Sequence, residues 1–216
     1  MNTKFNFIIR LFVISLFFFS HQIYGQTGST IQMPKPDTIG GKPLMQALKE
    51  RKTTRSFSDQ KLPDQVLSNL LWAAFGVNRP DGHRTAPSAM NWQEMDIYVA
   101  MENGLYVYDA DSNALKLVLN DDLRAKTGTQ DFVKDAPVTL VYVADMTKIK
   151  RASEDDVTLF YGADCGFIAQ NVYLYCASEG LACVVRGSID RTVLGKAMQL
   201  RDKQKILLAQ TVGYKK

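Results

Sequence analysis

The stretch Pro137-Val138-Thr139-Leu140-Val141-Tyr142-Val143-Ala144 decides the fold that the sequence predicts. Its residues are almost continuously apolar or β-branched, which is typical of a strand whose two faces are both buried. Such a strand lies at the centre of a sheet, with other elements packed on each face. We therefore expect a central strand over residues 137–144, with the rest of the chain arranged around it.

Further strands and helices are predicted on both sides of this stretch. The other predicted strands are residues 97–100, 104–108, 115–119, 182–185 and 205–214. The predicted helices, from apolar residues at helical spacing, are residues 44–49, 63–75, 161–179 and 190–200. Because several strands follow one another without an intervening helix, the pattern predicts an α+β fold rather than a regular alternation.

The N-terminal part differs in composition from the rest of the chain. Within residues 1–25 the charged side chains are Lys4 and Arg10, and an apolar run covers residues 11–19. This pattern predicts a secretory signal peptide, because a membrane span needs ~20 apolar residues. We therefore expect export to the periplasm or the extracellular space and no stable membrane span after cleavage; the alternative is an N-terminal membrane anchor. Residues 26–43 are expected to form a linker or surface arm, and residues 44–216 one domain.

Composition excludes several functional classes. The formal net charge of the 216 residues is only +4, which argues against nucleic-acid binding. The chain has no zinc-type ligand spacing, so no metal site is expected, and Cys165, Cys176 and Cys183 are interpreted as buried thiols. It also lacks a glycine-rich dinucleotide loop, so a separate nicotinamide-nucleotide domain is not expected.

Two stretches have side chains suited to ligand binding. Arg51-Lys52-Thr53-Thr54-Arg55 combines three positive charges with two hydroxyls, which suits a phosphate group. Residues 84–93 combine small residues with Ser88, Asn91 and Gln93, which suits the polar edges of a planar heterocycle. Taken alone, the first stretch is more typical of a solvated helix end, and the second could equally be an ordinary turn.

In combination, these stretches resemble the nitroreductase family of FMN flavoproteins. The resemblance runs in order through Arg51 to Phe57, Pro87 to Gln93, Asp135-Ala136-Pro137, Asp164 to Leu181 and Val212 to Lys215. It covers residues 44–216. It implies a three-layer sandwich in which helices flank a central, mostly antiparallel sheet, and it implies a homodimer whose two sites are each built from both subunits.

The resemblance also implies which residues contact the flavin. Arg51, Lys52, Thr53 and Arg55 would contact the ribityl chain and phosphate, and Lys215 and Lys216 would complete the phosphate site from the C-terminus. Pro87, Ser88, Ala89 and Asn91 would reach the isoalloxazine ring of the partner subunit. The backbone at Arg186-Gly187 would hold flavin N5 and O4, and Gln130 would approach the pyrimidine ring. Thr129 and Phe132 depart from the Asn/Lys pair that some members carry there.

The implied activity is an FMN-dependent oxidoreductase that passes hydride from NAD(P)H through flavin N5 to a small acceptor such as a nitroaromatic or a quinone. The flavin supplies the chemistry, so no catalytic side chain is assigned. His83 could donate a proton or could be a solvated loop residue. A closer resemblance, at residues 71–76, 84–88 and 104–109, is to the azoline (thiazole/oxazole) dehydrogenase branch, so a peptide azoline dehydrogenase is one alternative. A non-catalytic flavin-fold binding protein is the other.

Overall fold

A computed structural model describes residues 29–216, so the predicted signal peptide lies outside the described residues. The strands are β1 (Thr30–Gln32), β2 (Met95–Met101), β3 (Gly104–Asp109), β4 (Ala114–Leu119), β5 (Val138–Asp145), β6 (Ala182–Arg186) and β7 (Gln204–Gly213). The α-helices are α1 (Leu44–Glu50), α2 (Asp64–Phe75), α3 (Glu154–Glu179) and α4 (Arg191–Ala197). In the described part of the chain, no helix is both long and apolar enough to cross a membrane.

The strands form one sheet in the order β1-β4-β3-β2-β5-β7-β6, and every pair of neighbours is antiparallel. The strand β5 lies in the interior of this order, and all eight of its residues are buried. Leu140, for example, is opposite Val99 on β2 and Gln210 on β7. The predicted central strand is therefore confirmed, together with the α+β class.

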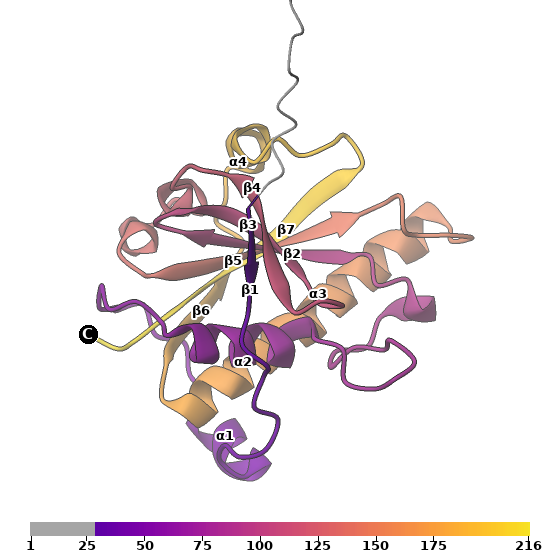
Figure 1. The fold of residues 1–216 in the computed structure, drawn as a ribbon. Helices are drawn as coiled ribbons and strands as arrows, with labels where there is room; N and C mark the ends of the chain where they lie inside the picture. Colours follow the sequence, from indigo (N-terminus) through magenta and orange to yellow (C-terminus); the bar gives the residue numbers. More distant parts are fainter. Residues whose placement is uncertain (1–28) are drawn as a thin grey trace, which may run out of the picture.

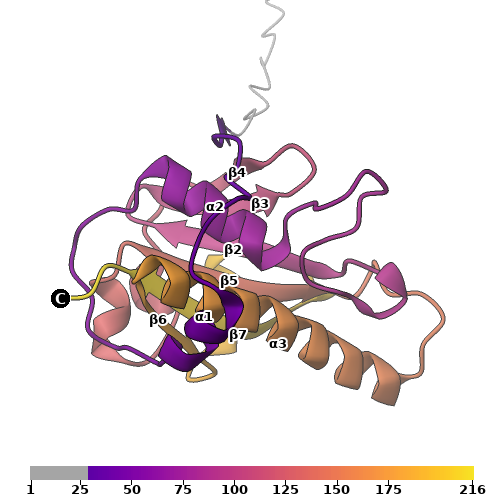
Figure 2. The same ribbon diagram turned by 90° about the horizontal axis from the view of Figure 1, so that it is seen from below.

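Helices cover both faces of the sheet, as Figures 1 and 2 show: α1, α2 and α3 lie on one face, and α4 lies on the other. Successive residues of a strand point to opposite faces. Leu140 and Tyr142 accordingly join the core beneath α2 and α3, whereas Val141 and Val143 pack with Leu194 of α4. Both faces of β5 are thus apolar because each is covered, and the expected three-layer arrangement is confirmed.

The helix α3 begins at Glu154, earlier than the Tyr161 start that the sequence suggested, so that boundary was wrong. The Ser153 hydroxyl accepts a hydrogen bond from the backbone N–H of Asp156 at 3.2 Å, which is an N-cap. Three acidic residues follow in the first turn, where they favour the positive end of the helix dipole. The helix ends at Gly180, which adopts φ 73° as a left-handed C-cap. The other notable boundary error is at α4, which ends at Ala197 rather than at residue 200.

Part of the N-terminal arm belongs to the sheet. The sequence predicted no strand within residues 26–43, yet β1 pairs with β4 and places Thr30 opposite Lys116. A three-residue strand has no periodicity that can be read from sequence, and its pairing depends on the exposed edge of β4. The arm is therefore fixed to the sheet edge at residues 30–32.

Candidate functional site

The segment after α1 lies against the end of the sheet and against the C-terminus. The backbone N–H of Thr54 donates to the carbonyl of Cys183 on β6 at 2.9 Å, and that of Ser58 donates to the carbonyl of Tyr214 at 3.0 Å. Phe57 and Lys215 form an antiparallel bridge between these two contacts. Figures 1 and 2 show the chain end beside this segment. The segment at residues 51–58 and the C-terminal residues 214–215 therefore meet in space.

A cavity of about 350 Å³ opens where these parts meet. Its lining includes five cationic side chains and one carboxylate, Glu50. The cationic side chains belong to Lys42, Lys49, Arg51, Lys52 and Lys215. Glu50 is paired with Lys42 at 2.6 Å, which leaves a clear excess of positive charge. We refer to this cavity as the cationic cavity. A concentration of cations at one concave site favours binding of an anionic group such as a phosphate.

Tyr173 of α3 connects the predicted binding segment to the sheet. Its hydroxyl accepts the backbone N–H of Val185 on β6 at 2.9 Å and lies 3.1 Å from the hydroxyl of Thr53. The guanidinium of Arg51 lies over the Tyr173 ring, 5.3 Å from its centroid. Tyr173 thus fixes both Arg51 and Thr53. This role of Tyr173 could not be predicted from the sequence, because an aromatic residue on the buried face of a long helix is typical of a core position.

Two further residues that were predicted to contact the flavin ribityl chain and phosphate lie outside the cationic cavity. Arg55 and Lys216 are exposed, and neither lines the cationic cavity. Thr53 is also exposed, although its hydroxyl is oriented by Tyr173. The structure therefore places Arg51, Lys52 and Lys215 around one cavity and leaves Arg55 and Lys216 on the adjoining surface.

A second cluster forms at the end of β6, where Arg186, Gly187 and the loop that contains Gln130 approach one another. The backbone N–H of Thr129 donates to the carbonyl of Ser188 at 3.0 Å, which ties this loop to the chain after β6. Gly187 is exposed and Gln130 is half-buried. These residues are consequently neighbours, although Gln130 makes no side-chain hydrogen bond within residues 29–216.

The side chain of Arg186 points into the protein and is only 6% exposed. Its guanidinium donates to the carbonyl of Thr127 and to the hydroxyl of Thr211, both at 2.6 Å. Burial lowers its pKa to about 10, so it stays charged at neutral pH. None of the carboxylates in the described part of the chain forms a salt bridge with it. A Cβ on Gly128 would lie 2.5 Å from the Arg186 Nη1, so glycine at this position makes room for the guanidinium.

Residues 87–93 form the part of the stretch 84–93 that resembles the family's loop, and they lie against α3. The backbone N–H of Ala89 donates to Asp164 Oδ2 at 2.9 Å, and the hydroxyl of Ser88 accepts the backbone N–H of Gln93 at 3.0 Å. Met90, Asn91 and Gln93 have φ values of 50°, 52° and 49°, a left-handed conformation that non-glycine residues rarely adopt. Pro87 and Asn91 are exposed. The loop is therefore held in an unusual backbone conformation at the protein surface.

Loop 87–93 and the cationic cavity contact different parts of α3. The loop contacts Asp164, whereas the cavity is lined by Tyr173 and Cys176. At ~1.5 Å of rise per residue, Asp164 and Tyr173 are separated by roughly 13 Å along the helix axis. Within one chain, the loop and the cavity therefore lie at different positions along α3.

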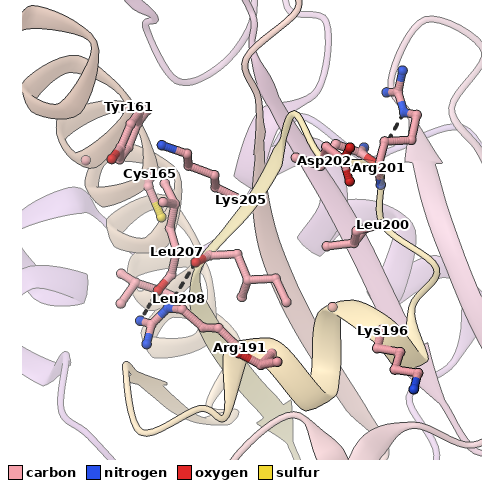
Figure 3. A pocket seen from close by; sticks show the side chains of 15 residues that line it. Tyr161, Cys165, Arg191, Lys196, Leu200, Arg201, Asp202, Lys205, Leu207 and Leu208 are labelled. Carbon is pink, nitrogen blue, oxygen red and sulfur yellow. Dashed lines mark hydrogen bonds between the residues drawn. The ribbon is translucent and has the colours of Figure 1, made fainter. Parts of the chain in front are cut away.

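A larger cavity, of about 940 Å³, lies between α3, α4 and β7. In Figure 3, Tyr161 and Cys165 come from α3 and Lys205 and Leu208 from β7, and Lys196 lies at the end of α4 with its amine directed away from them. Arg191 spans its wall and donates to the carbonyls of Ile206 and Leu207, at 3.0 and 2.8 Å. None of the predicted flavin-contacting residues lines this cavity.

Other candidate chemistry is sparse in residues 29–216. These residues contain no group of three or more His, Cys, Asp or Glu side chains that could hold a metal ion. His83 Nδ1 lies 2.8 Å from Asp81 Oδ1, away from the cationic cavity. Cys165, Cys176 and Cys183 are all buried, as the sequence indicated.

Comparison with known proteins identifies clear relatives. The model of the Nitroreductase family matches residues 48–214. A Methanocaldococcus jannaschii protein provisionally named a nitroreductase is 28% identical over 198 residues, which cover 87% of this chain and 98% of the relative. A crystal structure from Ralstonia eutropha JMP134, provisionally described as a nitroreductase, is 44% identical with a TM-score of 0.84, over 89% of this chain and 92% of that chain.

Two more distant structures share the fold alone. One is provisionally described as a nitroreductase of Desulfovibrio desulfuricans in complex with FMN, at 20% identity and a TM-score of 0.60, over 82% of this chain and 88% of that chain. The other is the E. coli microcin synthetase McbBCD complex with truncated pro-MccB17 bound, at 18% identity and a TM-score of 0.66, over 96% of this chain and 84% of that chain.

Proposed function

The chain belongs to the nitroreductase family of oxidoreductases, and we propose that it is an FMN-dependent enzyme whose cationic cavity holds the flavin phosphate. The observation that carries the proposal is the convergence of Arg51 and Lys52 with Lys215 around one cavity. These residues are separated by most of the domain in sequence, and they carry an excess of positive charge that a phosphate would neutralise.

The residues around the cavity suit a flavin nucleotide. Arg51 and Lys52 would bind phosphate oxygens, with Lys215 opposite, and the Thr53 hydroxyl, oriented by Tyr173, would contact the ribityl chain. Gly187 and Gln130 would lie along the ring edge, since both belong to the cluster at the end of β6. When bound, the flavin would accept a hydride at N5 from NADH or NADPH and pass the electrons to a small acceptor such as a nitroaromatic or a quinone. The protein's own part is to bind the phosphate, orient the ring and leave one ring face accessible.

We further propose that the site is completed in a homodimer. Loop 87–93 and the cationic cavity lie at different positions along α3, and the family resemblance implies that Pro87, Ser88, Ala89 and Asn91 contact the ring held by the partner. The helices beside the larger cavity carry exposed apolar side chains, which include Leu159 and Phe167 on α3 and Val193 on α4. An apolar surface of this kind suits association with a second copy.

A second candidate activity is peptide azoline dehydrogenation with the same flavin. It is favoured by the sequence resemblance at residues 71–76, 84–88 and 104–109 and accords with the fold shared with the microcin synthetase complex. Oxidation of a heterocycle-bearing peptide with concurrent loss of the oxidised flavin colour would favour it. A flavin-binding protein without turnover would show the colour and no reaction with either substrate class.

Residues 1–25 support the proposal that the protein is exported, with an N-terminal membrane anchor as the alternative. N-terminal sequencing of the protein from a native host would distinguish them. Cleavage near Gly25 supports export, and an intact N-terminus in the membrane fraction supports the anchor.

The enzymatic proposal is tested by anaerobic mixing of the FMN-loaded protein with NADH or NADPH. We expect loss of the yellow absorbance of the oxidised flavin with at least one donor, and its return when a nitroaromatic or quinone is added. Retention of the colour with both donors would leave a flavoprotein but would contradict the NAD(P)H oxidoreductase activity.

A further inference from the structure

A pair of buried carboxyl groups supports loop 87–93 from beneath. Glu94, the residue before β2, is fully buried, and Asp164 of α3 is 3% exposed. Neither carboxyl oxygen of Glu94 accepts a well-aligned hydrogen bond from another residue among residues 29–216; the donor beside it is its own backbone N–H, and the carboxyl of Asp164 is its neighbour. Asp164 in turn accepts the backbone N–H of Ala89.

Elementary chemistry requires a proton between these groups. Two carboxylates are both acceptors, so they can form a hydrogen bond only when one of them is protonated. Burial disfavours the charged form, and a second carboxylate at close range disfavours it further. Burial, together with the neighbouring Asp164, raises the pKa of Glu94 to about 7. Burial raises the pKa of Asp164 as well, but the Ala89 N–H and the Glu94 carboxyl both stabilise its charged form, so the proton belongs on Glu94.

The charged groups near Glu94 do not replace the proton that the two carboxyl groups need. Lys148 is the nearby cation, but its Nζ is bound to Asp96 Oδ1 at 2.6 Å and to the carbonyl of Gln93 at 3.3 Å. The thiol of Cys165, on α3 beside Asp164, has its pKa raised to about 12 by burial, so it stays neutral.

Two more charged groups approach Glu94 from other elements. Asp145 at the end of β5 donates its backbone N–H to the carbonyl of Glu94, and its carboxylate is bound by Arg201. Arg84 donates to the side chain of Gln93. The Asp145 carboxylate is paired with Arg201, and Arg84 Nη2 is paired with Asp111 at 3.0 Å. Arg84 Nη1 has no partner among residues 29–216 and does not donate to Glu94, so the proton shared with Asp164 remains the means of satisfying Glu94.

We propose that Glu94 and Asp164 share one proton, and that this protonated pair positions loop 87–93. The bond from the Ala89 N–H to Asp164 anchors the loop just before three residues in the left-handed conformation. Loss of the proton places two negative charges side by side in the interior, and Asp164 and the loop must then shift apart from Glu94. In relation to catalysis the inference rests on the proposed function, because the loop would contact the flavin of the partner. Glu94 and Asp164 are positioning residues rather than catalytic ones.

The sign of the effect on stability follows from the proton balance. The native protein holds this proton up to pH about 7, whereas an ordinary glutamate releases it near 4.5. Between these values the folded state binds more protons than the unfolded state, so the stability contributed by this pair falls as pH rises and reaches its minimum above about 7.

The inference is tested on flavin-free protein by titrating pH while monitoring Trp92, which lies in the loop, in a Trp72→Phe background. The chain has two tryptophans, so Trp92 is then the reporter. We expect a step in its emission centred near pH 7 and a fall in the melting temperature over the same range. Glu94→Gln, whose amide donates to Asp164 without titrating, should abolish both changes. Glu102→Gln, at an exposed glutamate paired with Lys61, is the matched control and should leave both unchanged.

A step that persists in Glu94→Gln, or its absence from the protein with native Glu94, would overturn the inference. Asp164→Asn is the second variant: it removes one charge and supplies a donor, so the step should move to lower pH, and an unshifted step would also overturn it. Because no flavin is present, these outcomes are independent of cofactor binding. Failure to take up FMN would contradict the proposed function alone.

Discussion

Lys215 reaches the cationic cavity because the chain end pairs with Phe57, so its side chain is held opposite Arg51 and Lys52. Charge-assisted hydrogen bonds contribute about 1.5–3 kcal/mol. Lys215→Ala is therefore expected to weaken FMN binding roughly tenfold or more, while riboflavin, which lacks the phosphate, should bind as before. Titration of flavin fluorescence measures both affinities. Lys150→Ala, at an exposed lysine outside the cavity, is the control; equal losses for FMN and riboflavin would contradict a phosphate role.

Gly128 is the residue that makes room for the buried Arg186 guanidinium. Gly128→Ala should displace this side chain and disrupt its bonds to Thr127 and Thr211, at a cost on the order of 2 kcal/mol in the free energy of unfolding. Urea unfolding measures the change. In an Arg186→Met background the same substitution should cost less, because the displaced bonds are already absent. An equal cost in both backgrounds would show that Arg186 is not the group that Gly128 accommodates.

At the scale of elements, α3 supports both candidate regions, since Asp164 contacts loop 87–93 and Tyr173 fixes Arg51 and Thr53. Its N-cap is Ser153, so Ser153→Ala should reduce the free energy of unfolding by ~1 kcal/mol. Chemical denaturation provides the measurement, with Ser112→Ala, in an exposed turn, as the control. A loss no greater than that of the control would show that this cap contributes little to α3.

The elements differ in how well the sequence predicts them, for identifiable reasons. The strand β5 is predictable because both of its faces are buried, so Val138 to Ala144 are almost uniformly apolar or β-branched. The first turns of α3 were missed because Glu154, Asp155 and Asp156 are exposed and interrupt the apolar pattern. The strand β1 was missed because it has three residues and pairs with β4, which is distant in the sequence.

The residues of the candidate site also divide into those that the sequence predicts and those that it does not. Arg51, Lys52 and Lys215 could be proposed from residue type and order, because phosphate binding needs cations. Tyr173 and the Glu94–Asp164 pair could not, since their roles arise from contacts between α3 and distant segments. Packing of this kind leaves no local pattern in the sequence.

At the scale of the whole molecule, the proposed homodimer would bring loop 87–93 of one chain to the flavin held at the cationic cavity of the other. Phe167 on α3 is 47% exposed and lies on a helix that borders the larger cavity. Phe167→Glu should shift sedimentation from dimer to monomer and weaken flavin binding, because a charge buried at an interface is strongly disfavoured. Ile39→Glu, at an 86% exposed residue, is the control. A native monomer that binds FMN tightly would contradict the two-chain site.

The central claim is that the cationic cavity at Arg51, Lys52 and Lys215 holds the phosphate of FMN. The measurement that tests it most directly is calorimetric titration of the flavin-free protein with FMN and, separately, with riboflavin. We expect one FMN bound per chain, with an affinity about tenfold or more above that of riboflavin, because the phosphate adds charge-assisted bonds of about 1.5–3 kcal/mol. Absence of FMN binding, or equal affinities for the two flavins, would contradict the account.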